Sequence, residues 1–380
     1  MHKAVKKRIL QLVASSQGGA ATHVRDLAQN LLPDRYEVTV AFSLDDGNIS
    51  PADFTSRGIR FVPVSIAGGL AWREVFRLRR LFTAEQPDLV HLHGARAAFY
   101  GRLAARIMPK RPKIVFSIHG FASPFYGQPK RAIYLAIERA LQSVTDHTVA
   151  VAQAEADLFC AHGLTSRARI SVIPYGIDVG RFATSTTDLG ALKKSLRLPD
   201  KAQIILTVCR INIPRDFDSL LRAFGSLCND FETAYLLIVG DGPQRPQVEA
   251  LIAELGLSNR VQITGYRDDI PDLMALAGIY TLTSYGWEGY PISTMEAQAA
   301  GVPVVVTDAG GSGEAVRHEK TGIVAPKRQP DALAHALRRL LVDPALRQQM
   351  GQAGRQRAEQ EFTYRAMMDK IEAIYEKVLA

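Results

Sequence analysis

The sequence predicts an α/β protein built from two doubly wound domains. Its 380 residues exceed what one average domain needs. Short runs rich in Val, Ile and Leu alternate with amphipathic segments almost throughout, and this alternation breaks once near the middle and then restarts. Nearly continuous apolar strands are typical of a parallel sheet that helices cover on both faces. We therefore expect two such sheets, each between layers of helices.

The predicted strands of the first domain begin with the first apolar run. They are residues 8–15, 36–42, 60–64, 88–94, 113–120 and 147–152. Residues 170–182 then run from a strand into a turn that contains Pro and Gly, and a polar stretch rich in Ser and Thr continues to about residue 200. This break predicts a domain hinge near residues 174–184.

The alternation restarts in the second half. Predicted strands follow at residues 203–210, 234–240, 260–264, 278–284 and 302–307. The last fifty residues have a helical pattern, and the final helix is amphipathic, so it must pack against another element. The predicted domains are residues 1–175 and 182–362.

Composition excludes several classes of protein. No apolar run approaches the roughly 18 residues that span a bilayer. The first apolar run is short for a signal peptide and contains Gln11, so it is predicted to be a strand. Cys160, Cys209 and Cys228 are too far apart for a disulfide framework or a zinc site. We expect them to be buried free thiols in a cytoplasmic protein.

The net charge of +8 is uneven along the chain. Residues 1–175 hold 23 Lys and Arg against 13 Asp and Glu, which gives +10, and the remainder holds 23 against 25, which gives −2. The basic half is expected to meet something anionic, such as nucleic acid, phospholipid or a phosphorylated substrate.

Ligands in parallel α/β sheets bind beyond the carboxyl ends of the strands. The first such loop contains Gly18 and Gly19 but matches neither the dinucleotide fingerprint nor the P-loop. The glycines would let backbone N–H groups approach an anion at a helix N-terminus, although a plain tight turn is equally compatible. His119 ends a strand and could bond a sugar hydroxyl, or it could be a structural histidine. His91 and His93 also end a strand, but no carboxylate or Cys shares their spacing, so no metal site is predicted.

Two arginines lie near the start of a helix in the second domain. Arg210 ends the first strand there, and Arg215 lies just before the predicted helix. Together they would make a diphosphate site, because one guanidinium can donate two parallel hydrogen bonds to phosphate oxygens. Asp216 and Asp218 have the spacing of some metal-binding motifs, but we expect them to cap and charge-match the first helical turn.

Two weaker candidates follow later strands of the same domain. Gly242 lies in a glycine turn after a strand, and Tyr266 lies in a loop that could line a base pocket.

The stretch EGYPISTMEA, residues 288–297, separates Glu288 from Glu296 by eight positions. Pro291 suits the first position of a helix, which leaves Glu288 on the preceding loop and Glu296 about one and a half turns inside. Backbone N–H groups at the helix mouth favour an anion. They belong to Gly289, Tyr290 and Ile292. Carboxylates on either side of a bound anion suit the hydroxyls of a ribose and a sugar ring, whereas a glycosidase pair would lie across one bond.

An ordered set of stretches resembles the retaining glycosyltransferases of the GT-B fold, in the glycogen-synthase-like group known as glycosyltransferase family four. EGYPISTMEA resembles the E-x7-E signature of that group, and the resemblance covers about residues 10–365. The other matching stretches are GGAATHVRDLAQNL, HLHG, SIHG, VIPYGID, AGVPVVVTDAGGSGEAV and TGIVAP. The resemblance implies two Rossmann-like α/β/α domains facing across a cleft, with a final helix at about 363–380 that crosses back to the first domain.

The resemblance also implies a role for each candidate residue. Glu296 would hold the ribose hydroxyls of the nucleotide, and Glu288 those of the donor sugar. Arg210 and Arg215 would neutralise the leaving diphosphate, and His119 would contact the donor sugar near the reacting carbon. The remaining donor-binding candidates are Gly18, Gly19, Gly242, Tyr266, Gly289, Tyr290, Pro291 and Ile292. No cofactor or catalytic metal is implied, and we favour a UDP-sugar over a GDP-sugar as donor.

The chain departs from the family pattern at two positions. Arg215 stands where Lys is usual, which keeps the charge but changes the geometry of phosphate contacts. Tyr175 stands where Asn is common, and the sequence gives no reason for it.

These features predict a retaining, metal-independent hexosyltransferase that uses a nucleotide diphosphate sugar. The acceptor would be a glycan, a lipid-linked sugar or a small molecule, and the expected pathway is cell-envelope polysaccharide or glycolipid synthesis. Two alternatives on the same fold are a nucleotide-sugar epimerase and a non-catalytic nucleotide-sugar binding protein.

The acceptor is expected on the basic first domain, which carries aromatic residues among its arginines. Residues 72–82 combine Trp72, Phe76 and Phe82 with Arg73, Arg77, Arg79 and Arg80. Residues 102–113 form a second basic cluster, and residues 121–131 form an aromatic loop after His119. Such a surface suits anionic lipid headgroups on the inner face of the membrane, although a core-packed helix with a solvated Arg face is the alternative. No nucleic-acid-binding motif is found, and no oligomeric state is predicted.

Overall fold

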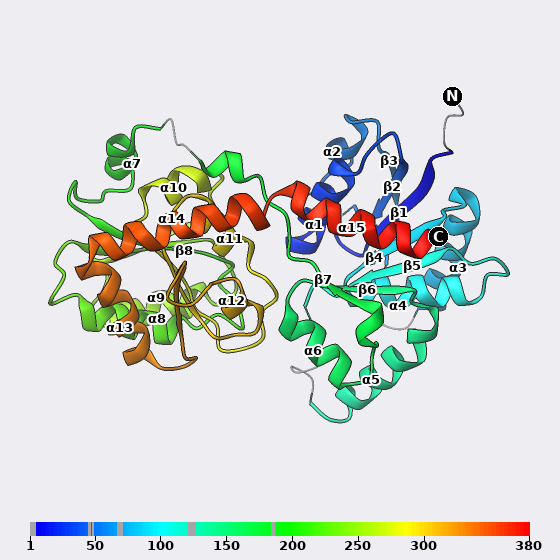
Figure 1. Cartoon of the computed structure of the whole chain (residues 1–380). Helices are drawn as coiled ribbons and strands as arrows, with labels where there is room; N and C mark the ends of the chain where they lie inside the picture. Colours follow the sequence, from blue (N-terminus) through cyan, green and yellow to red (C-terminus); the bar gives the residue numbers. More distant parts are fainter. Residues whose placement is uncertain (1–4, 45–46, 48, 67–70, 121–126, 184–186) are drawn as a thin grey trace. The chain divides into compact units, whose positions relative to one another are not determined.

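The computed structural model describes every residue except 1–4, 45–46, 48, 67–70, 121–126 and 184–186 (Figure 1). The chain divides into two compact units, Met1–Gly176 with Tyr364–Ala380, and Ile177–Thr363. The second unit thus begins at Ile177 rather than at the predicted residue 182. The reason is local, since the Ile177 N–H donates to the Phe362 carbonyl at 2.7 Å and ties this segment to the end of the second unit.

The first unit contains a seven-stranded parallel sheet in the order β3-β2-β1-β4-β5-β6-β7. Its strands are β1 Lys7–Val13, β2 Tyr36–Phe42, β3 Arg60–Pro63, β4 Leu89–His93, β5 Lys113–Ser117, β6 His147–Ala150 and β7 Ile170–Val172. Its helices are α1 Gly18–Asn30, α2 Ala52–Thr55, α3 Trp72–Glu85, α4 Gly94–Arg106, α5 Lys130–Leu141, α6 Gln153–Ala161 and α15 Tyr364–Leu379. Short 3-10 turns follow α5 at Gln142–Val144 and precede β7 at Arg167–Arg169.

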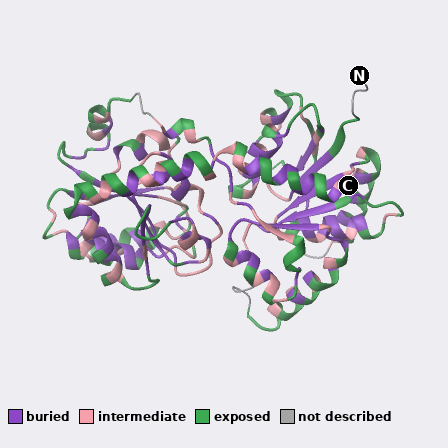
Figure 2. Ribbon diagram, in the orientation of Figure 1, coloured by how far each residue is buried: buried purple, intermediate pink, exposed green. Residues whose placement is uncertain are grey.

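The strands of this sheet are apolar on both faces, as the sequence predicts. Every residue of β4 and β6 is buried, and β1 is buried from Ile9 onward. Figure 2 shows these strands buried between helices whose outer faces are exposed. Apolar clusters on the two faces of the sheet supply the core of the unit.

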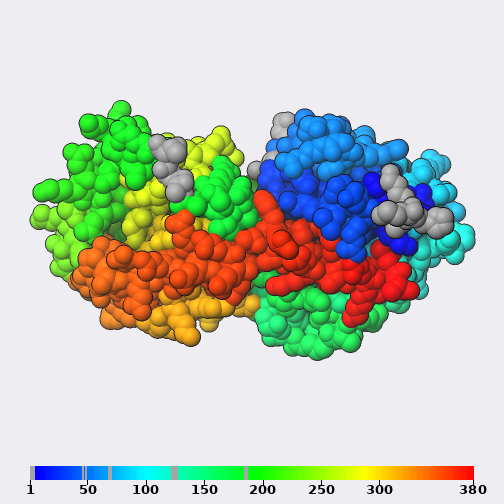
Figure 3. Space-filling model, turned by 45° about the horizontal axis from the view of Figure 1, so that its top comes forward, coloured from blue at the N-terminus to red at the C-terminus, as the bar shows by residue number. Residues whose placement is uncertain are grey.

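The last helix, α15, belongs to the first unit, as the family resemblance implies. It packs against α1, and its apolar side chains complete the cluster on one face of the sheet. These buried side chains are Met367, Met368, Ile371, Ile374, Tyr375 and Val378. The apolar face of the helix is therefore buried against a face of the sheet formed by residues far earlier in the chain, from Ile9 to Ile173. Figure 3 shows the outer faces of α14 (orange) and α15 (red) at the surface.

The second unit contains a six-stranded parallel sheet in the order β10-β9-β8-β11-β12-β13. Its strands are β8 Gln203–Val208, β9 Ala234–Val239, β10 Val261–Gly265, β11 Ile279–Leu282, β12 Val304–Thr307 and β13 Gly322–Ala325. Its helices are α7 Leu189–Ser195, α8 Phe217–Leu227, α9 Arg245–Glu254, α10 Ile270–Leu276, α11 Ile292–Ala299, α12 Gly311–Glu314, α13 Pro330–Val342 and α14 Pro344–Glu361, with a 3-10 turn at Val179–Phe182.

Among the described strands, β13 is the one that the sequence did not predict. It has four residues and begins with Gly322, a poor strand former. A Cβ atom at Gly322 would lie 2.1 Å from the Val304 carbonyl oxygen, so the close pairing of β13 with β12 requires glycine there. Because glycine is required at this position, the strand lacks a side chain that would have marked it in the sequence.

Each sheet reverses its strand order at one point, between β1 and β4 in the first unit and between β8 and β11 in the second. Ligands in open α/β sheets bind at such a point, outside the carboxyl ends of the strands. His93 ends β4, Gly18 begins the helix after β1, and Arg215 and Glu288 lie in the loops after β8 and β11. The topology therefore brings the candidate residues of each unit to one end of its own sheet.

Several expectations about individual side chains were wrong. The three cysteines are free but partly exposed rather than buried. Phe82 is fully buried in the core, so it does not belong to the aromatic surface of α3. Arg102, assigned to a basic surface cluster, lies in the interior and pairs with Glu138. The aromatic stretch at residues 121–126 lies outside the described residues. Among the residues that the structure describes, none forms a helix long and apolar enough to cross a membrane.

Candidate functional site

The candidate donor site of the second unit is built around the start of α11. The helix begins at Ile292, and Pro291 occupies the N-cap position with an extended backbone, one residue earlier than predicted. The Pro291 carbonyl accepts the N–H groups of Thr294 and Met295, which starts the helix without a side-chain cap. Glu288 therefore lies on the loop before the helix, and Glu296 lies within its second turn.

Arg215 and Glu288 form an ion pair, although 73 residues separate them in the sequence. Arg215 Nη1 lies 2.9 Å from Glu288 Oε1, and the two side chains are 17% and 12% exposed. Ser284 joins them, since its Oγ accepts from Arg215 Nη1 at 2.8 Å and donates to Glu288 Oε1 at 2.9 Å. A backbone bridge between Arg215 and Ser284 fixes the two loops together. The result is a rigid carboxylate with a guanidinium beside it.

The backbone around Glu288 is held from its other side. Glu288 N–H donates to the Ala309 carbonyl at 3.2 Å, and the Glu288 carbonyl accepts from the Gly311 N–H at 3.1 Å. Tyr290 turns away into the interior, where its hydroxyl accepts from Arg357 Nη2 at 2.8 Å. Burial raises the pKa of Tyr290 to about 12. The side chain of Tyr290 therefore anchors the loop, which leaves Gly289 and Ile292 to offer backbone groups.

Glu296 is the titratable group that its surroundings perturb most clearly in this site. Burial raises the pKa of its carboxyl to about 7, and the positive charge of Arg181 opposes that shift. Within the described part of the chain, the Glu296 carboxyl has no hydrogen-bond partner. A partly buried carboxyl without a partner, inside the mouth of a helix, is suited to accept hydrogen bonds from hydroxyl groups of a ligand.

Arg210 lies on the same loop as Arg215 but is exposed, and none of the described residues forms an ion pair with it. The predicted helix cap is confirmed, because Asp216 Oδ1 accepts from the Ser219 N–H at 3.1 Å at the start of α8. Asp218 pairs with Arg222 one turn later, so neither aspartate is arranged for a metal.

The two weaker candidates have different environments. A Cβ atom at Gly242 would lie 2.3 Å from the Ile211 carbonyl oxygen, so this glycine allows the loop after β9 to pack against the loop after β8. Tyr266 is 75% exposed, and its side chain is hydrogen-bonded with that of Asp268.

In the first unit, Gly18 and Gly19 form the exposed first turn of α1, directly after β1. His119 follows β5 and has a backbone φ of 54°, a conformation that residues other than Gly rarely adopt. Both of its ring nitrogens have partners. Nε2 lies 2.9 Å from His93 Nδ1, and Nδ1 lies 2.9 Å from the Tyr175 hydroxyl.

Three histidines, His23, His93 and His119, bring ligand atoms within 4.8 Å of one another. The rings of His93 and His119 are inclined by only 24°, with centroids 5.2 Å apart, and they face each other through the 2.9 Å hydrogen bond. The two nitrogens, one carrying the hydrogen and the other accepting it, are thus directed at one another rather than at a common point. The arrangement is that of a hydrogen-bonded pair rather than a convergent metal site.

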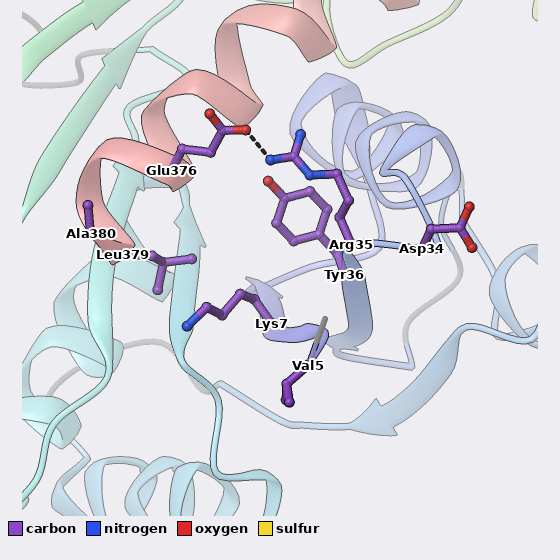
Figure 4. Close-up of a pocket in the computed structure, with 8 residues that line it drawn as sticks. All are labelled: Val5, Lys7, Asp34, Arg35, Tyr36, Glu376, Leu379 and Ala380. Carbon is purple, nitrogen blue, oxygen red and sulfur yellow. Dashed lines mark hydrogen bonds and ion pairs between the residues drawn. The ribbon is translucent and has the colours of Figure 1, made fainter. Parts of the chain in front are cut away.

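The pocket in Figure 4 lies elsewhere. It has a volume of about 310 Å³ and is lined by residues at the amino ends of β1 and β2 and at the end of α15, among them Lys7, Tyr36 and Glu376. None of the candidate residues lines it, and ligands of parallel sheets bind at the opposite, carboxyl ends. It is therefore not the candidate site.

Sequence reasoning missed two residues of the second unit and gave no reason for Tyr175. Ser284 ends a predicted strand, the same signal that marked His119, and it could have been found in that way. Arg181 carries no sequence signal, because its relation to Glu296 arises only when the turn at Val179–Phe182 packs against α11.

Two family descriptions match this chain in succession. "Glycosyltransferase Family 4" matches residues 17–181, and "Glycosyl transferases group 1" matches residues 190–357. The "GDP-mannose-dependent alpha-(1-6)-phosphatidylinositol monomannoside mannosyltransferase" of Mycobacterium tuberculosis is 30% identical over 289 residues, which are 74% of this chain and 73% of that protein. The "UDP-Gal:alpha-D-GlcNAc-diphosphoundecaprenol alpha-1,3-galactosyltransferase" of Escherichia coli is 26% identical over 309 residues, 80% and 79% of the two chains.

Among solved structures, Anabaena Alr3699/HepE in complex with UDP and glucose is similar in fold. Its TM-score is 0.84 at 23% identity, over 98% of this chain and 100% of that chain. The matching families, the relatives and the two parallel-sheet units agree, and the chain belongs to the group 1 glycosyltransferases of the GT-B fold.

Proposed function

We propose that this glycosyltransferase moves a hexose-type sugar from a nucleotide diphosphate sugar to an acceptor with retention of configuration and without a metal ion. The observation that carries the proposal is the arrangement of two carboxylates on either side of the start of α11. Glu288 is held rigidly by Arg215 and Ser284, and Glu296 is partly buried with no hydrogen-bond partner among the residues that the structure describes.

In this proposal Glu296 accepts hydrogen bonds from the ribose of the nucleotide, and Glu288 accepts them from the donor sugar. Arg215 supplies positive charge beside the diphosphate, aided by Arg210. Arg215 Nε supports that role, because it is buried and lacks an acceptor among the described residues. Negative charge grows on the leaving diphosphate as the glycosidic bond breaks, and a preorganised guanidinium stabilises it.

Retention is supported by the linkages that two of the relatives form. The Mycobacterium tuberculosis and Escherichia coli proteins form α linkages from GDP-mannose and UDP-galactose, which are themselves α-linked nucleotide sugars. A UDP-sugar is our favoured donor, since the Anabaena structure was solved with UDP. The acceptor is proposed to be a glycan, a lipid-linked sugar or a small molecule, in cell-envelope polysaccharide or glycolipid synthesis.

A thermal-shift screen against UDP, GDP and ADP tests the donor site. A nucleotide that binds the folded state raises the free energy of unfolding by mass action, by about 2.7 kcal/mol at 100 times its Kd, and Tm rises with it. We expect UDP to give the largest shift and Glu296→Ala to abolish it. A UDP shift that Glu296→Ala leaves unchanged would remove Glu296 from the donor site.

The reaction itself distinguishes the proposal from a nucleotide-sugar epimerase and from a binding protein. Incubated with a nucleotide sugar alone, an epimerase interconverts two sugars, a transferase hydrolyses the donor slowly, and a binding protein leaves it intact. With an acceptor present, the anomeric configuration of the product reports retention. Full activity in the presence of a chelator is expected if no metal is used.

The basic helix α3 supports a peripheral contact with anionic membranes. Trp72 and Phe76 are 65% and 52% exposed on it. Arg73, Arg79 and Arg80 are exposed beside them and, among the described residues, have no acidic partner, whereas Arg77 pairs with Glu74. We expect the protein to sediment with vesicles that contain phosphatidylglycerol and not with pure phosphatidylcholine vesicles, and Trp72→Ala with Phe76→Ala to weaken this binding.

A further inference from the structure

A chain of hydrogen bonds runs through the interior of the first unit and ends at Tyr175. It joins side chains from β1, β4, β5, α15 and the segment that follows β7. In order, it comprises Ser117, His91, Tyr375, Gln11, His93, His119 and Tyr175. Each of its six contacts is between 2.7 and 2.9 Å.

The chemistry of the groups gives this chain a direction. Gln11 Oε1 can only accept, so His93 Nε2 carries a hydrogen and donates to it at 2.7 Å. In a neutral His93 the other nitrogen, Nδ1, must then accept. The His119 Nε2–H therefore donates to His93 Nδ1 at 2.9 Å. His119 Nδ1 is left as an acceptor, and the Tyr175 hydroxyl donates to it at 2.9 Å.

The rings are neutral because they are buried. Burial holds the pKa values of His91, His93 and His119 well below the usual range, and each histidine in the cluster further disfavours charge on its neighbours. Burial also raises the pKa of the Tyr175 hydroxyl, so that it remains a donor. The cluster thus holds its histidines uncharged.

Tyr175 contacts His119 by stacking as well as by its hydroxyl. The two rings are inclined by 10° with centroids 5.7 Å apart. His23, from α1, packs against both of them, with its centroid 5.1 Å from that of His119 and 5.0 Å from that of Tyr175. On the next residue, the Gly120 N–H donates to Glu155 Oε1 at 2.8 Å, which holds the strained turn at His119. The titratable groups that face His119 are thus His23, His91, His93, Tyr175 and Glu155.

We propose that Tyr175 is a positioning residue, whose hydroxyl and ring hold His119 as a neutral imidazole with its hydrogen on Nε2. The inference rests on the proposed function in one respect: its consequence for catalysis assumes the contact with the donor sugar that the family resemblance implies for His119. It also accounts for the tyrosine at a position where the family commonly has asparagine, since the ring is what stacks on His119.

The consequence for catalysis is electrostatic. When a glycosidic bond to a nucleotide breaks, positive charge grows on the sugar ring while negative charge grows on the diphosphate. An imidazolium next to that sugar would oppose the reaction by repulsion. A histidine that accepts a hydrogen bond from Tyr175 is stabilised in its neutral form. Loss of that donor should lower the ratio of neutral to protonated His119 about fivefold at a given pH.

The variant Tyr175→Phe tests this, because it removes the hydroxyl and keeps the stacked ring. Tyr36→Phe is the matched control. Tyr36 is buried in the same unit, packs against Tyr375 at 6.0 Å, and has a hydroxyl with no hydrogen-bond partner within the described residues. Both variants lose one buried hydroxyl, but only the first loses a bond to His119.

Nitrogen-15 NMR of histidine-labelled protein gives a readout that needs no substrate. With the His119 signals assigned from His119→Gln, we expect wild-type Nδ1 to be unprotonated and hydrogen-bonded and Nε2 to carry hydrogen. In Tyr175→Phe the Nδ1 signal should move to higher frequency, toward that of a free acceptor, and should remain unchanged in Tyr36→Phe. A wild-type His119 protonated on Nδ1, or an unchanged Nδ1 signal in Tyr175→Phe, overturns the proposal.

Kinetics at saturating donor give the second readout. We expect Tyr175→Phe to move the acid limb of the kcat profile to higher pH, so that kcat falls up to about fivefold on that limb and little near neutral pH, and to leave the donor KM within about twofold. A Tyr175→Phe enzyme with the wild-type kcat and pH profile overturns the catalytic part of the inference. If the wild-type protein transfers no sugar at all, the proposed function fails, while the NMR result still decides whether Tyr175 sets the state of His119.

Discussion

At the scale of single residues, Glu296 shows how a binding group is kept at a cost to the fold. Burial raises its pKa to about 7 from a usual value of 4.5. The contribution of this carboxyl to stability is therefore full below about pH 4.5 and is lost as pH rises through 7. A shift of this size corresponds to about 3 kcal/mol at pH 8.

We predict that Glu296→Gln stabilises the second unit at pH 8 and not at pH 4.5. The free energy of unfolding, from urea titration, should rise by up to about 3 kcal/mol. Glu254→Gln, at an exposed position of the same unit, is the control and should change little at either pH. Equal effects of Glu296→Gln at both pH values would contradict the burial argument.

The same group predicts the pH dependence of donor binding. The carboxylate accepts ribose hydroxyls better than the neutral acid does, so affinity for the nucleotide should fall about tenfold between pH 8 and pH 6. Calorimetric titration measures this directly. In Glu296→Gln the affinity should be lower throughout and independent of pH over that range.

Substitutions at Arg215 can separate the effect of its positive charge from the effect of its hydrogen-bonding geometry. Arg215→Met leaves Glu288 beside an apolar chain and removes charge from the diphosphate, so kcat should fall about 10²–10³-fold. Arg215→Lys restores the residue that the family usually has, and we expect a loss of about tenfold or less. Steady-state kinetics decide it, and a methionine variant as active as the lysine variant would exclude the electrostatic role.

At the scale of elements, a buried ion pair joins α4 to α5 in the first unit. Arg102 Nη2 lies 2.9 Å from both oxygens of Glu138, and the side chains are only 2% and 3% exposed. The Arg102 Nε–H donates to the Ala98 carbonyl at 2.9 Å, and the guanidinium lies over the ring of Phe116 at 4.8 Å. The pair is thus satisfied by further contacts, as a buried charge must be.

Removing one partner of this pair should destabilise the first unit strongly. Arg102→Met is expected to cost about 3–5 kcal/mol in the free energy of unfolding, because Glu138 is left buried and unpaired. The double variant Arg102→Met with Glu138→Leu should recover most of that loss. Urea denaturation of the three proteins measures both values, and a double variant no more stable than Arg102→Met would contradict the explanation.

At the scale of the whole molecule, α15 makes the fold of the first unit depend on the last residues of the chain. Its six buried apolar side chains contribute on the order of 10 kcal/mol. Tyr375 also donates to His91 Nδ1 and accepts from Gln11 Nε2. The helix therefore completes both the core and the histidine network of the first unit.

A chain that ends at Thr363 should lose the first unit and keep the second. Calorimetry is expected to show the unfolding transition of the second unit alone, and UDP should still raise its Tm, because the proposed nucleotide contacts all lie within Ile177–Thr363. Retention of both transitions would show that α15 is dispensable for the first unit.

The sequence determined the class of fold, both sheets apart from β13, the helical C-terminal end of the chain and the acidic pair around α11. These features depend on apolar periodicity, on turn residues and on motifs that lie within a few residues of one another. Tertiary structure alone decided that Ser284 joins Arg215 to Glu288, that Arg181 faces Glu296, and that Arg102 is buried. The tertiary structure alone also showed that Tyr175 contacts His119. Such contacts join segments far apart in the chain, and a local pattern carries no record of which loops a sheet brings together at the ends of its strands.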